Sequence, residues 1–378
     1  MMLRPAIILV LTLSYVGASD NEGCTRNVHP IDRKYFYIGG EYVFDMATNR
    51  SLMSGQMYVE HLSPSYGIQQ PYPLVLIHGK GMTGTNWLNT PDDRPGWAMY
   101  FLEQGYEIYI VDQPARGRST WLLNDMIEVN MFSAEMIEER FTACSFYKQW
   151  PQASVHTQWP GDNNLTKGRM GDPIFDAFYA STVQFIVNET ITQTLIQKAG
   201  AALLDKIGSA ILLTHSQSGS FGWVIADARP HLVKAIVAIE PKGPPFQEAV
   251  FSNKSARSWG IADIPLTYEP AISSSIDLLT KEVLSTHDNL TSCILQNEPI
   301  HTLIDLIDIP VLIETSQASY HATYDHCTVE FLRQAGVHVD FIRLEELGIY
   351  GNGHMQMMEK NNLQIAEVLH QWIRKTVH

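Results

Sequence analysis

Six short runs of aliphatic and β-branched residues recur along the chain, and they constrain its fold more than any other feature. Most are almost continuously apolar, which is typical of strands buried on both faces of a parallel sheet. The last run alternates more, as an edge strand does. The runs are PLVLIH (73–78), EIYIVD (107–112), SAILLT (209–214), VKAIVAI (233–239), IPVLIE (309–314) and VHVDFIR (337–343).

Helical patterns lie between and after these runs. In the stretch 362–377 the apolar residues follow the spacing of one helix face: Ile365, Val368, Leu369, Trp372 and Ile373. Strands that alternate with helices predict crossover connections and a mostly parallel, doubly wound α/β sheet. Ahead of them, KYFYIGGEYVF and GQMYVEHL predict two antiparallel strands joined by a polar turn around Asn49 and Arg50.

Residues 119–185 interrupt this rhythm. They are rich in Phe, Tyr and Trp but show no clear strand period, and connections of this length are usually lids or extra subdomains. We interpret them as a cap inserted into one domain that spans residues 19–378, and we expect the irregular stretch 241–300 to complete this cap.

The first 18 residues have the features of a signal peptide. Arg4 precedes an apolar run that ends in small residues suited to cleavage, and the run is shorter than the ~20 residues that span a bilayer. We therefore expect a secreted, extracellular protein without stable membrane insertion. The net charge is −14 and no basic cluster stands out, so no nucleic-acid partner is expected.

Cysteines and glycosylation motifs agree with export. The even number of cysteines predicts two disulfides in an oxidising compartment, with the pairing left open: Cys24, Cys144, Cys293 and Cys327. Five N-x-S/T motifs predict a glycosylated surface: Asn49, Asn164, Asn188, Asn253 and Asn289.

A nucleophilic serine is expected where the run 209–214 ends. A serine on a tight turn between a strand and a helix is presented to the cleft that lies beyond the strands. Ser216 follows the strand directly, whereas Ser218 would already lie in the helix, so Ser216 is preferred. The usual pattern G-x-S-x-G is incomplete here, because Thr214 and Ser218 replace both glycines.

A serine hydroxyl needs a base, and the base in turn needs a carboxylate. His354 follows the last strand in a Gly/Asn-rich loop, from which it can reach back over the sheet. Glu240 ends the run 233–239 next to Pro241 and is the preferred acid, while Asp325 and Glu314 remain alternatives.

An oxyanion hole needs two N–H donors. Gln217, directly after the nucleophile, provides one. The second is expected from HGKGMTG, where Gly79 and Gly81 let the backbone of Lys80 or Gly81 approach a substrate, while His78 braces the loop.

Five segments in order, HGKGMTG, VDQPARGRS, LLTHSQSG, AIEPKGPP and GNGHMQMMEKNN, resemble the α/β-hydrolase superfamily over roughly residues 55–378. Within it the chain looks like the secreted esterase branch with H-S-Q-S-G, E-P-x-G-P-P and G-N-G-H. The resemblance implies Ser216 as nucleophile, Glu240 as acid and His354 as base, with Lys80 and Gln217 N–H groups as the oxyanion hole. Asp325 stays open, because the superfamily more often places its acid after the seventh strand.

These residues together predict hydrolysis of a carboxylic ester or lactone through an acyl-enzyme, without a metal or organic cofactor. The aromatic cap suggests a small, apolar substrate. Two alternatives remain: a secondary-metabolite pathway hydrolase that cyclises or tailors a product, as related fungal enzymes imply, and a non-catalytic binding module of the same fold.

Overall fold

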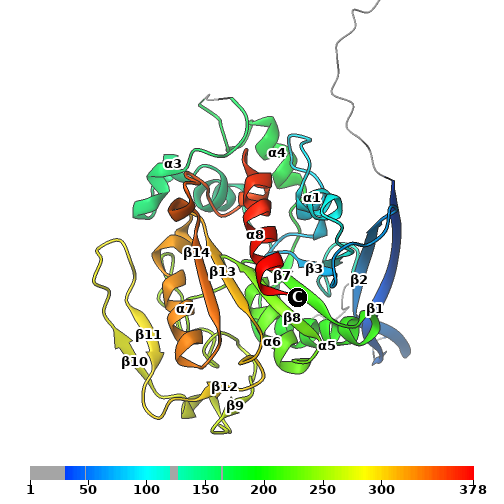
Figure 1. Ribbon diagram of the computed structural model, residues 1–378, viewed down its shortest axis with the longest axis vertical. Coiled ribbons are helices and arrows are strands. Elements are labelled where there is room, and N and C mark those ends of the chain that lie inside the picture. The colour runs from blue at the N-terminus through cyan, green and yellow to red at the C-terminus, as the bar shows by residue number, and fades with distance from the viewer. Residues whose placement is uncertain (1–29, 47, 120–126, 163–164) are drawn as a thin grey trace, which may run out of the picture.

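A sheet of eight strands, in the order β1-β2-β4-β3-β7-β8-β13-β14, forms the centre of the computed structural model (Figure 1). The structure describes residues 30–46, 48–119, 127–162 and 165–378, so the predicted signal peptide lies outside the described residues. The strands are β1 (Ile31–Asp45), β2 (Arg50–Pro64), β3 (Leu74–Ile77), β4 (Ile108–Asp112), β7 (Ala210–His215), β8 (Val233–Ile239), β13 (Val311–Thr315) and β14 (Val339–Arg343). Each predicted strand is therefore present.

The sheet is mostly parallel, as predicted. β1 and β2 form the expected antiparallel pair, and β2 also pairs antiparallel with β4. All pairs from β4 to β14 are parallel. β14 is an edge strand with only its first residue fully buried, which explains its more alternating sequence.

Helices cover both faces of the sheet, which is why the central strands are apolar throughout. One face packs against α5 (Glu189–Ile207), α6 (Ser218–Ala228) and α7 (Asp325–Gln334), and the other against α1 (Trp97–Glu103) and α8 (Asn362–Thr376). Within β3, Val75 and Ile77 face the first core while Leu74 and Leu76 face the second. The structure thus confirms the doubly wound α/β fold.

The aromatic-rich segment lies at one end of the molecule, where α3 and α4 are seen in Figure 1. Its described elements are β5 (Val129–Asn130), α2 (Ala134–Ile137), a π-helical turn (Glu138–Thr142), α3 (Cys144–Tyr147), a 3-10 turn (Pro151–Val155), α4 (Pro173–Ala180) and β6 (Phe185–Ile186). No strand of the central sheet falls in the described part of 119–185.

The expectation that 241–300 completes this cap is only partly met. Its beginning, up to Ser252, lines a cavity together with the aromatic-rich segment. Further along, β9 (Tyr268–Glu269) pairs with β12 (Thr302–Leu303) at the opposite end of the molecule from α3 and α4 (Figure 1). The hairpin of β10 (Thr280–Val283) and β11 (Cys293–Gln296) flanks α7 instead.

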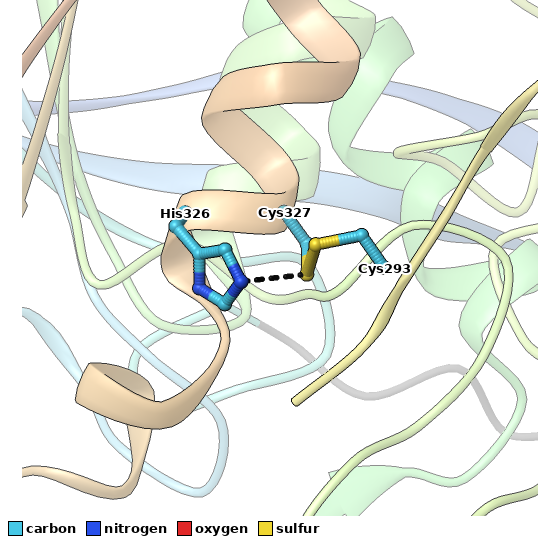
Figure 2. Close-up of side chains that lie close together, drawn as sticks. All are labelled: Cys293, His326 and Cys327. Carbon is cyan, nitrogen blue, oxygen red and sulfur yellow. Dashed lines mark hydrogen bonds between the residues drawn. A yellow bond between two sulfur atoms is a disulfide. The ribbon is translucent and has the colours of Figure 1, made fainter. Parts of the chain in front are cut away.

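One of the two predicted disulfides is present. Cys293 of β11 is bonded to Cys327 in the first turn of α7, and the His326 Nε2 atom lies 3.5 Å from the Cys327 sulfur (Figure 2). Cys144 is buried and makes no disulfide with another cysteine of the described ranges, while Cys24 lies outside them, so the second predicted disulfide stays a prediction. Among the helices of the described ranges, none is long and apolar enough to cross a membrane.

Candidate active site

Ser216 occupies a sharp turn between β7 and α6. Its φ is +58°, a left-handed conformation that is uncommon for a residue with a side chain. Two backbone hydrogen bonds hold the turn: Ser216 N–H donates to the Ile239 carbonyl (3.0 Å), and Lys242 N–H donates to the Ser216 carbonyl (2.8 Å). The neighbouring strand end therefore maintains the strained backbone that presents the Ser216 side chain.

Thr214 and Ser218 replace the two glycines of the G-x-S-x-G pattern, and two other glycines inside α6 supply the space that those glycines would have given. A Cβ on Gly222 would lie 3.2 Å from Thr214 Cγ2, so the helix accommodates the threonine by lacking a side chain there. A Cβ on Gly219 would lie 2.4 Å from Pro241 Cβ, which is a clash. The close approach of strand and helix is thus preserved from the helix side.

Ser218 has a structural position, in agreement with the preference for Ser216. Its Oγ accepts a hydrogen bond from His215 N–H (2.7 Å) and contacts the Ile77 carbonyl at 2.7 Å, and the side chain is fully buried. This hydroxyl therefore joins β3 to the start of α6 and does not line the cavity beside Ser216.

His354 and Glu240 lie in direct contact. His354 Nδ1 is 2.5 Å from Glu240 Oε2, and both side chains are buried. The carboxylate also accepts hydrogen bonds from Ser316 N–H (2.9 Å) and from the Ser319 hydroxyl (2.6 Å). Glu240 is thus held by the loop that follows β13, and its remaining contact is with the imidazole.

The two alternative acids have other partners. Asp325 contacts His321 Nδ1 at 2.9 Å and accepts from the Thr315 hydroxyl at 2.6 Å. Glu314 accepts from Gln356 Nε2 at 2.8 Å. Of the three candidates, the geometry brings only Glu240 to His354.

Burial dominates the ionisation of the pair. It lowers the pKa of His354 well below its usual range, so the imidazole is neutral near pH 7 and can accept a proton. It raises the pKa of Glu240 to about 7, against the charge of His321 and the hydrogen bonds from Ser316 and Ser319, which favour the carboxylate.

Tyr320 lies beside the serine and the histidine. Its hydroxyl lies 3.4 Å from His354 Nε2 and close to the Ser216 side chain. Among the hydrogen bonds of the described residues, none joins the Ser216 and His354 side chains directly, and the Tyr320 hydroxyl lies beside both. Nε2, the atom opposite the one that binds Glu240, faces the serine side of the cavity.

The loop after β3 passes directly over the serine. A Cβ on Gly79 would lie 3.2 Å from Ser216 Cβ, so only a glycine leaves this close approach unobstructed. The next residue is Lys80. Its N–H and that of Gln217 donate to no acceptor among the described residues, which leaves both available to a ligand. His78 braces the loop as expected, because its Nε2 accepts from Gln113 N–H at 3.2 Å.

A buried arginine connects the two segments that carry these donors. Arg116 donates to the Gly79 carbonyl (3.0 Å) and to the Gln217 side-chain oxygen (2.8 Å). Gln217 also donates to Glu189 (2.9 Å), which forms an ion pair with Lys80 at 2.7 Å. The Lys80 side chain is thereby engaged by Glu189, which leaves the Lys80 backbone N–H as the group that can act as an oxyanion donor.

The serine opens into a cavity of about 510 Å³. Aromatic and sulfur-containing side chains supply much of its wall, and they come from the aromatic-rich segment and from the loops after β3, β8 and β13. They include Met82, Phe132, Phe141, Phe185, Phe251 and Tyr320. The cavity is partly open, and both apolar and charged side chains line it around Ser216, His354 and Gln217.

Three residues of this site were not expected from the sequence: Ser319, Tyr320 and Arg116. Carboxylates were the residues expected after the run 309–314, whereas the hydroxyl groups of Ser319 and Tyr320, which follow that run closely, were not. Arg116 lies in VDQPARGRS, one of the five segments that carry the resemblance to the α/β-hydrolase superfamily, but no role was predicted for this residue. Their place after the strand run could have indicated Ser319 and Tyr320, whereas the partners of Arg116 come together only in the folded chain.

Glu240, His321 and His354 also place nitrogen and oxygen atoms within 4.8 Å of one another, an arrangement that could suit a metal ion. Their atoms are already engaged. His354 Nδ1 contacts Glu240, and the two nitrogens of His321 contact Asp325 and the Tyr324 hydroxyl (2.9 and 3.1 Å). The cluster is thus a hydrogen-bonded unit of the site.

Four of the five predicted glycosylation sites fall within the described residues, and all four asparagines are exposed: Asn49, Asn188, Asn253 and Asn289. Asn188 also caps α5, since its Oδ1 accepts from Ile191 N–H at 3.1 Å. Asn164 lies outside the described residues. Glycosylation of these positions stays a prediction.

Comparison with known proteins shows a relative that matches nearly the whole chain. The chain is 48% identical over 359 residues to a protein named "Probable secreted lipase phiG" from Fungal sp. (strain ATCC 74256), covering 95% of this chain and 94% of that protein. The fold of this chain is also similar to that of a solved structure described as a novel bacterial esterase. The TM-score is 0.63, and the two sequences are 22% identical over 93% of this chain and 98% of the esterase chain. No family model matches the sequence.

Proposed function

Because the chain belongs to the α/β-hydrolase superfamily of secreted esterases and lipases, we propose that it hydrolyses a carboxylic ester or lactone with Ser216 as the nucleophile. One observation carries the proposal. Ser216 lies on a strained turn and lines the same cavity as His354, and His354 Nδ1 lies 2.5 Å from Glu240 Oε2. A serine, a neutral imidazole and a carboxylate in this order can generate an acyl-enzyme.

In the proposed mechanism the Ser216 hydroxyl turns to His354 Nε2 as it attacks the substrate carbonyl. His354 takes the proton, and Glu240 stabilises the resulting imidazolium through Nδ1. The negative charge that develops on the carbonyl oxygen is held by the Lys80 and Gln217 N–H groups. His354 then protonates the leaving alcohol and activates the water that releases the acyl group.

The aromatic-rich segment 119–185 acts as a cap in this proposal, and removal of residues 1–18 as a signal peptide gives the secreted chain. Support for the cap comes from the cavity wall, to which Phe132, Phe141 and Phe185 contribute beside Ser216. Apolar surface at the mouth of a serine site suits the acyl or alcohol chain of a lipid-like ester.

The proposal is tested with the Ser216→Ala protein, assayed on para-nitrophenyl esters of increasing chain length. We expect hydrolysis to fall by several orders of magnitude and covalent labelling by a fluorophosphonate to disappear. Ser218→Ala is the matched control, since it removes the neighbouring hydroxyl but should keep labelling. An unlabelled wild-type protein would favour the non-catalytic binding module, and full turnover by Ser216→Ala would refute the assignment.

A further inference from the structure

Arg140 is a charged group in the cavity that the mechanism does not use. It lies on the π-helical turn Glu138–Thr142, and it lines the same cavity as Ser216 and His354. Single π-helical turns within helices occur frequently at functional sites. Its guanidinium stacks on the ring of Phe251, with the central carbon 3.9 Å from the ring centroid.

The other charged side chains of the cavity wall already have partners. Lys80 and Lys242 both pair with Glu189, at 2.7 and 3.1 Å. Glu248 pairs with Arg257 at 2.8 Å. Each charged side chain of these two clusters therefore has a partner, although the first cluster, with two lysines on one carboxylate, keeps a net positive charge.

Arg140 differs from them. No ion pair or hydrogen bond of its side chain is formed within the described ranges, and its Nε atom is buried without a partner. The adjacent Glu139 is close enough to act on Arg140 electrostatically, but its carboxylate accepts its hydrogen bond from Gln149, at 2.9 Å. A buried, unpaired donor of a charged group is costly, and native structures usually satisfy it. A ligand is the natural partner that the protein itself does not provide.

The position of Arg140 relates it to the reacting centre. The Phe251 ring under the guanidinium lies 5.2 Å from the Tyr320 ring, which in turn lies 4.9 Å from the His354 ring. Two aromatic rings thus separate the cation from the imidazole. A group bound at Arg140 would belong to the same small molecule that presents its carbonyl to Ser216.

We propose that Arg140 binds a carboxylate of the substrate, so that the ester cleaved at Ser216 is an acidic ester with an apolar body. The planar guanidinium can pair with both oxygens of a carboxylate while its flat face stays on the Phe251 ring. This inference rests on the proposed function of Ser216 and narrows its substrate class.

The test compares acidic and neutral esters of matched length. The acyl-side arm uses para-nitrophenyl hemisuccinate, hemiglutarate and hemiadipate against the corresponding neutral acyl esters. The alcohol-side arm uses para-carboxyphenyl butyrate against phenyl butyrate. We expect the wild-type protein to prefer the acidic member in one arm. Arg140→Met should then reduce kcat/KM for that ester by about tenfold to a hundredfold and leave the neutral ester within about threefold.

Two further variants sharpen the comparison. Arg140→Lys keeps the charge without the planar fork and should retain part of the preference. Arg169→Met is the matched control, because Arg169 also stacks on an aromatic ring, Phe146, at 4.1 Å but lies outside this cavity. It should leave both esters unchanged. No acidic preference in either arm, or an equal loss on acidic and neutral esters in Arg140→Met, would overturn the inference.

A binding measurement keeps the inference separate from the proposed function. Calorimetric titration with glutarate should show binding to the Ser216→Ala protein and at least tenfold weaker binding when Arg140→Met is added. If glutarate binds equally well with and without Arg140→Met, the proposed carboxylate site is wrong, even if the protein hydrolyses esters. Arg140-dependent binding supports it, even if the protein hydrolyses none of the esters and the role of Ser216 fails.

Discussion

Glu240 Oε2 lies 2.5 Å from His354 Nδ1, although the two residues are 114 positions apart in the chain. Glu240 follows β8 and His354 lies between β14 and α8, so the contact depends on the parallel order of β8, β13 and β14. His354 is also held from the nucleophile side, because its carbonyl lies 3.0 Å from His215 Nε2. The imidazole is thus fixed between two strand ends.

The first prediction concerns pH. Burial raises the pKa of Glu240 to about 7, and burial lowers that of His354 well below its usual range. The carboxylate form, which orients and stabilises the imidazole, therefore gains population as pH rises through about 7. We expect kcat/KM for a neutral ester to rise through the same range and to level off above it. A profile that stays flat down to pH 5 would contradict this assignment.

The second prediction separates the candidate acids. Glu240→Gln keeps the size of the side chain but removes the charge that stabilises the imidazolium, so kcat should fall by about ten-thousandfold, as for the acid of a serine protease. Asp325→Asn changes a carboxylate that contacts His321 and Thr315, and it should retain far more activity. Circular dichroism checks that both proteins fold. Equal losses of kcat in Glu240→Gln and Asp325→Asn would show that Glu240 is not the acid of the triad in preference to Asp325.

The third prediction concerns Arg116. A peptide bond is planar and trans, so a hydrogen bond that fixes the Gly79 carbonyl also fixes the Lys80 N–H, which points the opposite way. Arg116 makes that bond and also holds the Gln217 side chain. We infer that it positions both oxyanion donors. Arg116→Met should lower kcat by about a hundredfold with little change in KM.

A transition-state analogue distinguishes this positioning role from general destabilisation. A trifluoromethyl ketone forms the oxyanion, so its affinity for Arg116→Met should fall in parallel with kcat, whereas a substrate-like amide should bind nearly as before. Arg116→Lys keeps one donor nitrogen, so its kcat and its affinity for the analogue should lie between those of the wild-type protein and those of Arg116→Met. A variant in which KM rises and kcat is unchanged would argue against the positioning role.

The sequence predicted the strands, which recur as apolar runs, and the polar residues at the ends of those strands. Strands buried on both faces are apolar throughout, so β3, β7, β8 and β13 could be found, and Ser216 and Glu240 followed as the polar residues at strand ends. Arg116 and Arg140 could not be assigned roles, because their partners are distant in sequence and no local spacing brings them together. The same holds for the space that Gly222 gives Thr214, which exists only once the helix packs on the strand.

The fourth prediction tests that packing. A Cβ added at Gly222 would approach Thr214 Cγ2 to 3.2 Å. Overpacking costs about 1 to 3 kcal/mol and Ala gains about 1 kcal/mol over Gly inside a helix, so we expect Gly222→Ala to destabilise the fold by about 1 kcal/mol. Thr214→Ser removes the methyl group and keeps the hydroxyl. The double variant should therefore recover part of the loss in urea unfolding. Strictly additive effects would show that the two residues do not share this space.

The fifth prediction concerns the link between the aromatic-rich segment and the His354 loop. His156 Nε2 lies 2.6 Å from Glu359 Oε1, and Glu359 also accepts from Gly353 N–H (3.0 Å) and Asn352 Nδ2 (2.7 Å). Burial alone would lower the pKa of His156, but Cys144 and Glu359 outweigh it and raise the pKa to about 10. One carboxylate thus ties a charged histidine to the loop that carries the base.

The sign of the resulting pH dependence follows from linkage. Since the folded pKa of His156 exceeds the ordinary value of 6.5, the imidazolium contributes its full stabilisation below about pH 6.5 and loses it as pH rises toward about 10. Replacing His156 by Gln removes this contribution, so Tm should differ most between the two proteins near pH 6 and converge at pH 10. Because Glu359 holds the loop before His354, the variant should also lose activity at temperatures below its Tm. A Tm difference that is constant or grows with pH would show that His156 is neutral in the folded protein.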